Sequence, residues 1–345
     1  MIIFARKYLR MMKTALYPLS FRPSLHEKVW GGHRIEAFKG LPSTDRPVGE
    51  SWEISAVPGK ESVVAGGPLA GRSLASLVEE YGAALLGNGF QERFGGEFPL
   101  LLKFIDAAGD LSVQVHPDDV LAARSGARGK TEMWYVVDAA PDASLLVGFS
   151  RRITPEECLR RAQDGSIVEV LARHAIRPGD VFFLPAGRIH AICRGAFVAE
   201  IQQSSDITYR VFDYGRAGLD GKPRPLHVAE ALEALDFQVY DDYRTRYVPA
   251  PGGEVTLVRS PYFTTTLLTP DGPFRKDLTA QDAFVTMLCV KGEGTLCARM
   301  ADGSEHTLPL RPGVSLLLPA CTEGITLQPL AQSPLTLLSS FVEQA

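Results

Sequence analysis

Four side chains that can ligate a metal ion lie in three separate segments of the chain. Gln114 and His116 are two residues apart in an apolar stretch, so strand alternation would place both on the same face of a sheet. Glu132 lies in a second apolar segment, and His190 follows a Pro-x-Gly turn at residues 185–187. Two imidazoles and two oxygen donors leave room around a divalent ion for water or a substrate. The spacing therefore predicts a metal site assembled from separate strands.

The segments around these residues have the pattern of β-strands. Their apolar runs are short and are bounded by Gly or Pro, which is typical of strands that end in turns. We expect a mainly β protein whose first part has strands at residues 25–30, 51–57, 99–105, 112–116, 132–137, 144–149, 180–184 and 198–202.

Helical patterns are inserted between these strands. Apolar residues recur at three- and four-residue spacing over Ser73–Leu86. Thr154 is expected to begin a second helix, because a capping side chain is followed by Pro155 and by Glu157 near the positive end of the helix dipole. Two shorter helices are predicted at 167–174 and 226–235.

A second β module is predicted from about residue 246 onward, where strands alternate with Gly-rich turns. Its segment Gly313–Cys321 repeats the segment Gly179–Gly187, with glycine and proline at identical spacing. The position equivalent to His190 is Gly324, and no His-x-His or Gln-x-His pair precedes it. We therefore expect a metal-binding domain with helical insertions at residues 12–245 and a metal-free domain at residues 246–345.

Composition and charge restrict the classes of function. With 345 residues, of which 45% are hydrophobic, the chain is long enough for two folding units. A net charge of -4 without a basic run argues against nucleic acid or an anionic membrane as the partner. The longest apolar runs are far too short to span a bilayer. Five cysteines without a Cys-x-x-Cys pair fit neither a disulfide framework nor a zinc knuckle, so a reducing, cytoplasmic setting is expected.

The first residues of the chain are read as an N-terminal extension. Residues 1–11 are basic and partly apolar but lack the hydrophobic centre and the cleavage site of a signal peptide. The methionine pair Met11-Met12 indicates an upstream start. We expect residues 1–11 to be dispensable for activity and stability.

The segment Gly179–His190 resembles the second sequence motif of the cupin barrels. It matches that motif at its Gly, Pro, Gly and His positions, while the usual final Asn falls on Arg194. The resemblance, with the repeat at Gly313–Cys321, implies two cupin-like jelly-roll barrels, of which one binds a metal.

Five longer motifs follow one another along the chain. They are Trp-Gly-Gly at 30–32, Gly-Glu-Ser-Trp-Glu-Ile-Ser at 49–55, Gln-Val-His-Pro-Asp-Asp at 114–119, Lys-Thr-Glu-Met-Trp-Tyr at 130–135 and Ser-Asp-Ile-Thr-Tyr-Arg-Val-Phe-Asp-Tyr-Gly-Arg at 205–216. Together they resemble the short bacterial form of type I mannose-6-phosphate isomerase, over nearly the whole chain from Met12 onward. In that family one zinc ion is held by a Gln, a His, a Glu and a second His, which correspond to Gln114, His116, Glu132 and His190.

Further positions near the metal carry over from this family. They are Arg210, Asp206 and Lys130. Lys130, close to zinc and Arg210, would have its pKa lowered by like charge and is the candidate base, while Asp206 is a competitor for that role or for sugar-ring opening. The two could instead form a structural ion pair. The planar fork of Arg210 suits phosphate or sugar oxygens. Ser112 is expected to contact the phosphate, and Trp30 to line the pocket.

The resemblance implies the interconversion of mannose 6-phosphate and fructose 6-phosphate through a cis-enediol. Moving a proton between C1 and C2 develops negative charge on an adjacent oxygen, which a redox-inert Lewis acid stabilises. One alternative is a non-catalytic, metal-dependent sugar-binding or regulatory cupin, which would not need Lys130 or Arg210. Another is a cupin oxygenase, which usually needs a redox-active ion. The expected partner is a small sugar phosphate, and the expected state is a monomer or a weak homodimer.

Overall fold

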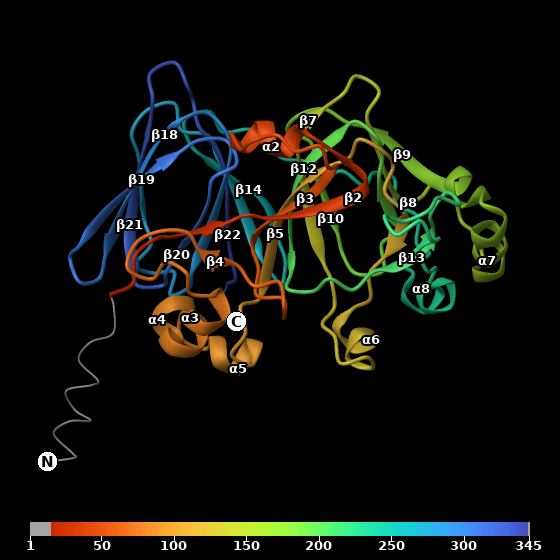
Figure 1. Cartoon of the computed structure of the whole chain (residues 1–345), viewed down its shortest axis with the longest axis horizontal. Coiled ribbons are helices and arrows are strands. Elements are labelled where there is room, and N and C mark those ends of the chain that lie inside the picture. Colours follow the sequence, from red (N-terminus) through yellow and green to blue (C-terminus); the bar gives the residue numbers. More distant parts are fainter. Residues whose placement is uncertain (1–14, 344–345) are drawn as a thin grey trace, which may run out of the picture.

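The computed structural model describes residues 15–343, and the predicted extension at residues 1–11 lies outside them. The protein is mainly β, as predicted, and its sheets form two modules side by side (Figure 1). Within the described range no helix is both long and apolar enough to cross a membrane.

The first module contains the predicted metal ligands and consists of two sheets of antiparallel pairs. Trp134 and Phe182 from one sheet pack with Val147 and Ile192 from the other, so the module has its own core. The six-stranded sheet has the order β10 (Val181–Leu184), β7 (Glu132–Ala139), β12 (Ala196–Gln203), β5 (Leu100–Asp106), β3 (Val48–Ile54) and β2 (Ser24–Gly32). The five-stranded sheet has the order β13 (Tyr209–Phe212), β6 (Val113–Val115), β11 (His190–Ile192), β8 (Ser144–Phe149) and β9 (Leu171–Ala175).

The second module also has two sheets, with a core of apolar side chains such as Met287 and Leu296 between them. The seven-stranded sheet has the order β14 (Glu254–Arg259), β15 (Thr264–Leu268), β22 (Thr336–Phe341), β17 (Val285–Lys291), β20 (Ser315–Leu318), β1 (Leu19–Arg22) and β4 (Val63–Val64). The four-stranded sheet has the order β16 (Phe274–Asp277), β21 (Thr322–Pro329), β18 (Gly294–Met300) and β19 (Glu305–Leu310). Leu19 of β1 pairs with Leu317 of β20, so the N-terminal segment completes a sheet whose other main strands follow residue 246.

Most predicted helices are present, and α7 begins at its predicted cap, Thr154. Ser73 accepts a hydrogen bond from the Ser76 backbone N–H, and Thr154 accepts one from the Glu157 backbone N–H. The predicted helix at 73–86 is broken at Gly82, which has a φ of 49°. The helices are α2 (Arg34–Lys39), α3 (Leu74–Tyr81), α4 (Ala83–Leu86), α5 (Phe90–Phe94), α6 (Asp119–Ala123), α7 (Pro155–Asp164) and α8 (Val228–Ala234).

The helix predicted at 167–174 is wrong. Only Ser166–Val170 is helical, as a short 3₁₀ turn, and Leu171–Ala175 forms β9. β9 pairs with β8, with His174 opposite Leu145. Leu171, Ala172 and Arg173 favour a helix locally, but the edge of the five-stranded sheet supplies hydrogen-bond partners to an extended chain, and this long-range pairing outweighs their propensity.

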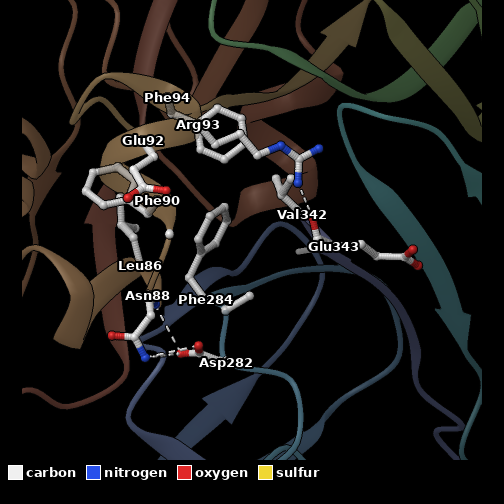
Figure 2. A pocket seen from close by; sticks show the side chains of 12 residues that line it. Leu86, Asn88, Phe90, Glu92, Arg93, Phe94, Asp282, Phe284, Val342 and Glu343 are labelled. Carbon is white, nitrogen blue, oxygen red and sulfur yellow. Dashed lines mark hydrogen bonds between the residues drawn. The ribbon is translucent and has the colours of Figure 1, made fainter. Parts of the chain in front are cut away.

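A buried apolar cluster joins the two modules. It includes Leu102 and Phe104 of β5, Leu317 of β20 and Leu338 of β22. A cavity of about 360 Å³ lies beside this cluster, where α4 and α5 meet the second module (Figure 2). Figure 2 shows aromatic rings around it, including that of Phe284. None of the predicted site residues lines this cavity.

Candidate metal centre and its cavity

A cavity of about 270 Å³ in the first module is lined by most of the predicted site residues. Strands of both sheets line it. Two predicted ligands, His116 and Glu132, contact the lining residue Lys130. The other predicted site residues that line the cavity are Trp30, Ser112, Gln114, His190, Asp206 and Arg210.

Three of the predicted ligands, His116, Glu132 and His190, form a compact, buried group, which we call the ligand group. The ligand atoms of His116, Glu132 and His190 all lie within 4.8 Å of one another. The two carboxylate oxygens of Glu132 are 3.6 Å and 3.4 Å from Nε2 of His116 and of His190, respectively. The arrangement arises because His190 in β11 pairs with Gln114 in β6, while Glu132 begins β7 in the facing sheet. In the described part of the chain this is the one such group found, and it could hold a metal ion.

Both histidines present Nε2 to the centre of the group. Nδ1 of His116 lies 2.9 Å from the Ile207 carbonyl oxygen, and Nδ1 of His190 lies 2.8 Å from that of Arg188. A ring that donates from Nδ1 keeps a lone pair on Nε2, as in metal-ligating histidines. Burial, assisted by the charge of Lys130, lowers the pKa of His190 to about 3 and that of His116 well below its usual value. Both imidazoles are therefore neutral, which is the form that binds metals.

The carboxylate of Glu132 also fits a metal ion. Its side chain is fully buried, and its Oε1 has no hydrogen-bond partner. Burial and the negative charge of Glu200 raise the pKa of Glu132. A dication beside it would satisfy the oxygen and favour the ionised form. Lys130 Nζ lies 2.7 Å from Glu132 Oε2 and 3.0 Å from His116 Nε2. The carboxylate oxygen and the imidazole nitrogen therefore already face one cation, the ammonium of Lys130.

Gln114 lies at the edge of the group. Its Nε2 is 3.3 Å from Nε2 of His190, and its Oε1 accepts a hydrogen bond of 3.3 Å from the Ser112 hydroxyl. A half-turn of the amide exchanges its nitrogen and oxygen, so the same position can offer a carbonyl oxygen. That Gln114 ligates a metal stays a prediction, and the structure places its side chain next to His190.

Buried ion pairs line the wall of the cavity. Lys103 Nζ lies 3.1 Å from a Glu200 carboxylate oxygen, and Trp134 Nε1 donates to the other oxygen at 2.9 Å. Burial disfavours the charged lysine, yet Glu200 and Glu50 raise the pKa of Lys103. Burial likewise opposes ionisation of Glu50, but Lys103 and Lys28 hold its pKa at about 2. These groups are therefore charged at neutral pH.

The cavity has an excess of positive charge. Its lining residues and Glu132 comprise six cations and four carboxylates, and the imidazoles of His116 and His190 are neutral. Such an excess in a partly enclosed site attracts anions. The cations are Lys28, Lys60, Lys103, Lys130, Arg210 and Arg224, and the carboxylates are Glu50, Glu132, Glu200 and Asp206.

Arg210 has unused hydrogen-bonding capacity. It lies on β13 opposite Gln114, and its Nη1 donates to the Pro225 carbonyl oxygen at 2.9 Å. Its Nε is buried and has no hydrogen-bond partner. Burial and the charge of Arg224 lower its pKa. An oxygen atom of a molecule bound in the cavity could accept a hydrogen bond from this N–H and so remove the free-energy cost of leaving it unsatisfied.

The mouth of the cavity contains a half-exposed ion pair. Lys60 Nζ lies 2.7 Å from Asp206 Oδ2, with side-chain exposures of 42% and 47%. Burial opposes ionisation of Asp206, but its bond to Lys60 lowers its pKa. Lys60 Nζ also lies 4.9 Å from the centre of the Trp52 ring. The alternative ion pair between Lys130 and Asp206 is not formed, because each has another partner.

Comparison with known proteins identifies the family. Residues 19–141 match the family described as phosphomannose isomerase type I, catalytic domain. The chain is 35% identical over 306 residues to the mannose-6-phosphate isomerase ManA of Bacillus subtilis, a match that covers 88% of this chain and 93% of the relative. The chain belongs to the type I phosphomannose isomerase family. Its mannose-6-phosphate isomerase relative from Streptococcus mutans is 36% identical over 308 residues, covering 88% of this chain and 92% of that protein.

A solved structure agrees with this assignment. The chain is similar to the crystal structure of the mannose 6-phosphate isomerase from Bacillus subtilis, with a TM-score of 0.83 and 34% sequence identity. The match covers 94% of this chain and 99% of the Bacillus subtilis chain. The family resemblance read from the sequence motifs is therefore confirmed.

Several residues of the cavity were missed by the sequence analysis. Lys103 lies between apolar residues in β5 and Glu200 is the one charged residue of β12, and such a charge in a buried strand is itself a signal. Glu50 lies inside the motif at 49–55, which resembles the family but does not by itself indicate that this residue lines the site. Lys60 lies in a Pro-Gly turn, and nothing in the sequence places it beside Asp206.

Proposed function

We propose that this chain is a zinc-dependent isomerase that interconverts mannose 6-phosphate and fructose 6-phosphate. The observation that carries the proposal is the buried group of His116, Glu132 and His190 beside a cationic cavity, in a chain of this family. The names of its relatives give the substrate. The five cysteines are free thiols, which supports a cytoplasmic setting, and a monomer or weak homodimer remains our expectation.

The proposed zinc ligands are Gln114, His116, Glu132 and His190. Two neutral imidazoles with oxygen donors suit Zn²⁺, and Glu132 Oε1 has no other partner. When bound, zinc would act as a Lewis acid toward the oxygen on which charge develops. One zinc per chain is expected, because Gly324 of the second module pairs with Asp277 and Arg299 and has no ligand side chain of its own.

The proposed proton carrier is Lys130, which transfers a proton between C1 and C2 through a cis-enediol. Its ammonium is buried beside the ligand group and lines the cavity. Asp206 is the competing candidate, also for sugar-ring opening. The bond to Lys60 makes Asp206 a weaker base, since its pKa is lowered, and its half-exposed position is at the mouth. These contacts favour Lys130 over Asp206 as the proton carrier.

The substrate is proposed to lie along the cavity between the metal ligands and the mouth. Arg210 offers a planar guanidinium with a buried, unpaired N–H to the phosphate or to sugar oxygens. Ser112 is buried next to Gln114 and has a hydroxyl for the same purpose. Trp30 supplies an apolar wall.

A coupled assay of mannose 6-phosphate conversion, with metal analysis of the same sample, tests this function. We expect about one zinc per chain, loss of turnover after chelation and recovery on adding zinc. A fully active sample without metal would refute the zinc proposal. Tight binding of sugar phosphate without turnover would instead indicate a non-catalytic cupin, and consumption of oxygen would indicate an oxygenase.

Lys60→Ala is expected to weaken substrate capture with little effect on the chemical step. Lys60 is half-exposed at the mouth, so its charge attracts the phosphate dianion, and the loss is screened by salt. We expect KM to rise roughly 3–10-fold at low ionic strength, less at high ionic strength, with kcat nearly unchanged. Steady-state kinetics at two salt concentrations measure this. Arg46→Ala, at an exposed pair with Glu27 outside the cavity, is the matched control, and an equal rise in KM there would contradict a specific role for Lys60.

A further inference from the structure

A buried charge cluster lies outside the cavity and has no part in the proposed chemistry. Lys39 Nζ donates to both carboxylate oxygens of Glu53, at 2.9 Å and 2.8 Å, and also to the Gly313 carbonyl oxygen. The hydroxyls of Ser51 and Ser315 donate to Glu53 at 2.6 Å and 3.0 Å. All five residues are therefore tied to one carboxylate–ammonium pair. The side chains of Lys39 and Glu53 are only 6% and 1% exposed.

This cluster, which we call the junction cluster (Lys39, Ser51, Glu53, Gly313 and Ser315), joins the two modules. Lys39 ends α2 and Glu53 lies in β3 of the first module, whereas Ser315 begins β20 of the second. Figure 1 shows α2 and β3 at the side of the first module that faces the second. Gly313 has a φ of 80°, and a Cβ there would lie 2.7 Å from Lys39 Cγ, so the lysine needs a glycine at this position. Gly313 and Ser315 belong to the repeat of the metal motif, which lacks a ligand at Gly324.

The opposite face of β3 forms part of the cavity wall. Glu50 and Trp52 of this strand line the cavity. Trp52 pairs with Lys103 of β5, and the next pair is Ile54 with Leu102, so Glu53 is the extra residue of a β-bulge. A bulge bends its strand and redirects the neighbouring side chains, and bulges are frequent beside active sites. The residue that makes the bulge is thus the residue that the second module holds.

Energetics argue against stability as the reason for this cluster. Burying an ion pair carries a desolvation cost, and replacing such a pair by apolar side chains of similar volume is often neutral or stabilising. The hydrogen bonds of the cluster instead fix one geometry, because Lys39 and Ser315 reach Glu53 from α2 and β20 while Ser51 donates from β3 itself. A cluster that fixes geometry behind a cavity wall can control where that wall lies.

We propose that the junction cluster is a positioning device for the active site: the second module, through Ser315 and the Gly313 carbonyl, holds the Glu53 bulge and thereby sets Glu50 and Trp52 in the cavity. This inference rests on the proposed isomerase function. It assigns a role to the metal-free repeat, which acts through β3 without contacting the substrate.

The double variant Lys39→Met/Glu53→Leu tests the proposal. We expect an unchanged or higher urea midpoint and unchanged zinc content, but a fall in kcat/KM of roughly 10-fold or more, since small misplacements in an active site are costly. The matched control is Thr265→Val/Ser340→Ala, which removes a buried side-chain hydrogen bond of 2.8 Å. Both residues lie in the seven-stranded sheet that also contains Ser315, and the control should leave kcat/KM unchanged. Wild-type kcat/KM in the double variant, or an equal loss in the control, would overturn the proposal.

A second readout does not depend on turnover. Trp52 Nε1 donates to Glu50 at 2.9 Å, so its indole N–H resonance, assigned with Trp52→Phe, reports the position of the wall. We expect this resonance to shift or broaden in the double variant, while that of Trp134 on β7 stays in place. A wild type without isomerase activity would refute the proposed function but leave this resonance test intact. Should the double variant fail to fold, Ser315→Ala removes a single donor, and an unmoved Trp52 resonance there would refute the positioning role.

Discussion

Replacing His190 with alanine is expected to abolish isomerase activity and to leave the protein folded. His190 presents a neutral Nε2 to the ligand group, and no other described histidine or carboxylate joins that group to replace it. A Lewis-acid metal contributes several kcal/mol to stabilising developing charge, so its loss predicts a fall in kcat/KM of roughly 10³-fold or more. The cores of the second module and of the junction between modules do not include His190. Zinc content, kcat/KM and urea unfolding of the variant measure the effect.

His174→Ala is the matched control for this variant. His174 is a half-buried histidine of β9 whose ring packs against Phe182 and Tyr243, and it does not line the cavity. The His174→Ala variant should have a somewhat lower free energy of unfolding but should keep its zinc content and its isomerase activity. If His190→Ala unfolds while His174→Ala does not, the metal is needed for the fold. This outcome would contradict the proposal that the metal serves catalysis and not folding.

The candidate ligands could be proposed from the sequence because they lie in short segments with local signatures or, for Glu132, in a motif shared with the family. Alternation relates Gln114 to His116, and a Pro-x-Gly turn precedes His190. The strands that carry them were found for the same reason, since apolar runs bounded by Gly or Pro are local patterns. The pairing of His190 with Gln114 then brings the segments together in space.

The partners of buried charges could not be predicted in this way. Lys103 meets Glu200 because β5 pairs with β12, nearly one hundred residues later, and no local pattern records that pairing. The bond from Ser315 to Glu53 crosses the junction between modules for a similar reason. The misassigned segment at 167–174 is a related case, because the edge of a sheet formed by distant residues decided between helix and strand. Long-range contacts therefore set the surroundings of the site, while local patterns identify its candidate ligands.

Arg210→Ala is expected to lower kcat/KM by roughly 10²-fold or more, about 2.7 kcal/mol of transition-state stabilisation, without releasing zinc. Arg210 lines the cavity and carries a buried Nε without a partner, so it is placed to donate to a charged oxygen of the substrate. It is not among the ligand group, and its strand is held by backbone pairing to β6. The zinc content should therefore stay near one per chain, and the loss should appear in the kinetics.

Two further variants separate the geometry of the guanidinium from its charge. Arg210→Lys keeps a positive charge but loses the planar fork, so it should recover only part of the activity if two-point hydrogen bonding matters. Arg194→Ala removes an exposed arginine, with 71% side-chain exposure, that does not line the cavity, and it should behave as wild type. Near-wild-type kcat/KM in Arg210→Ala would leave the metal centre in place but refute the role given to this arginine. Full recovery in Arg210→Lys would show that its contribution is the net charge of the cavity, because the lysine supplies that charge without the fork.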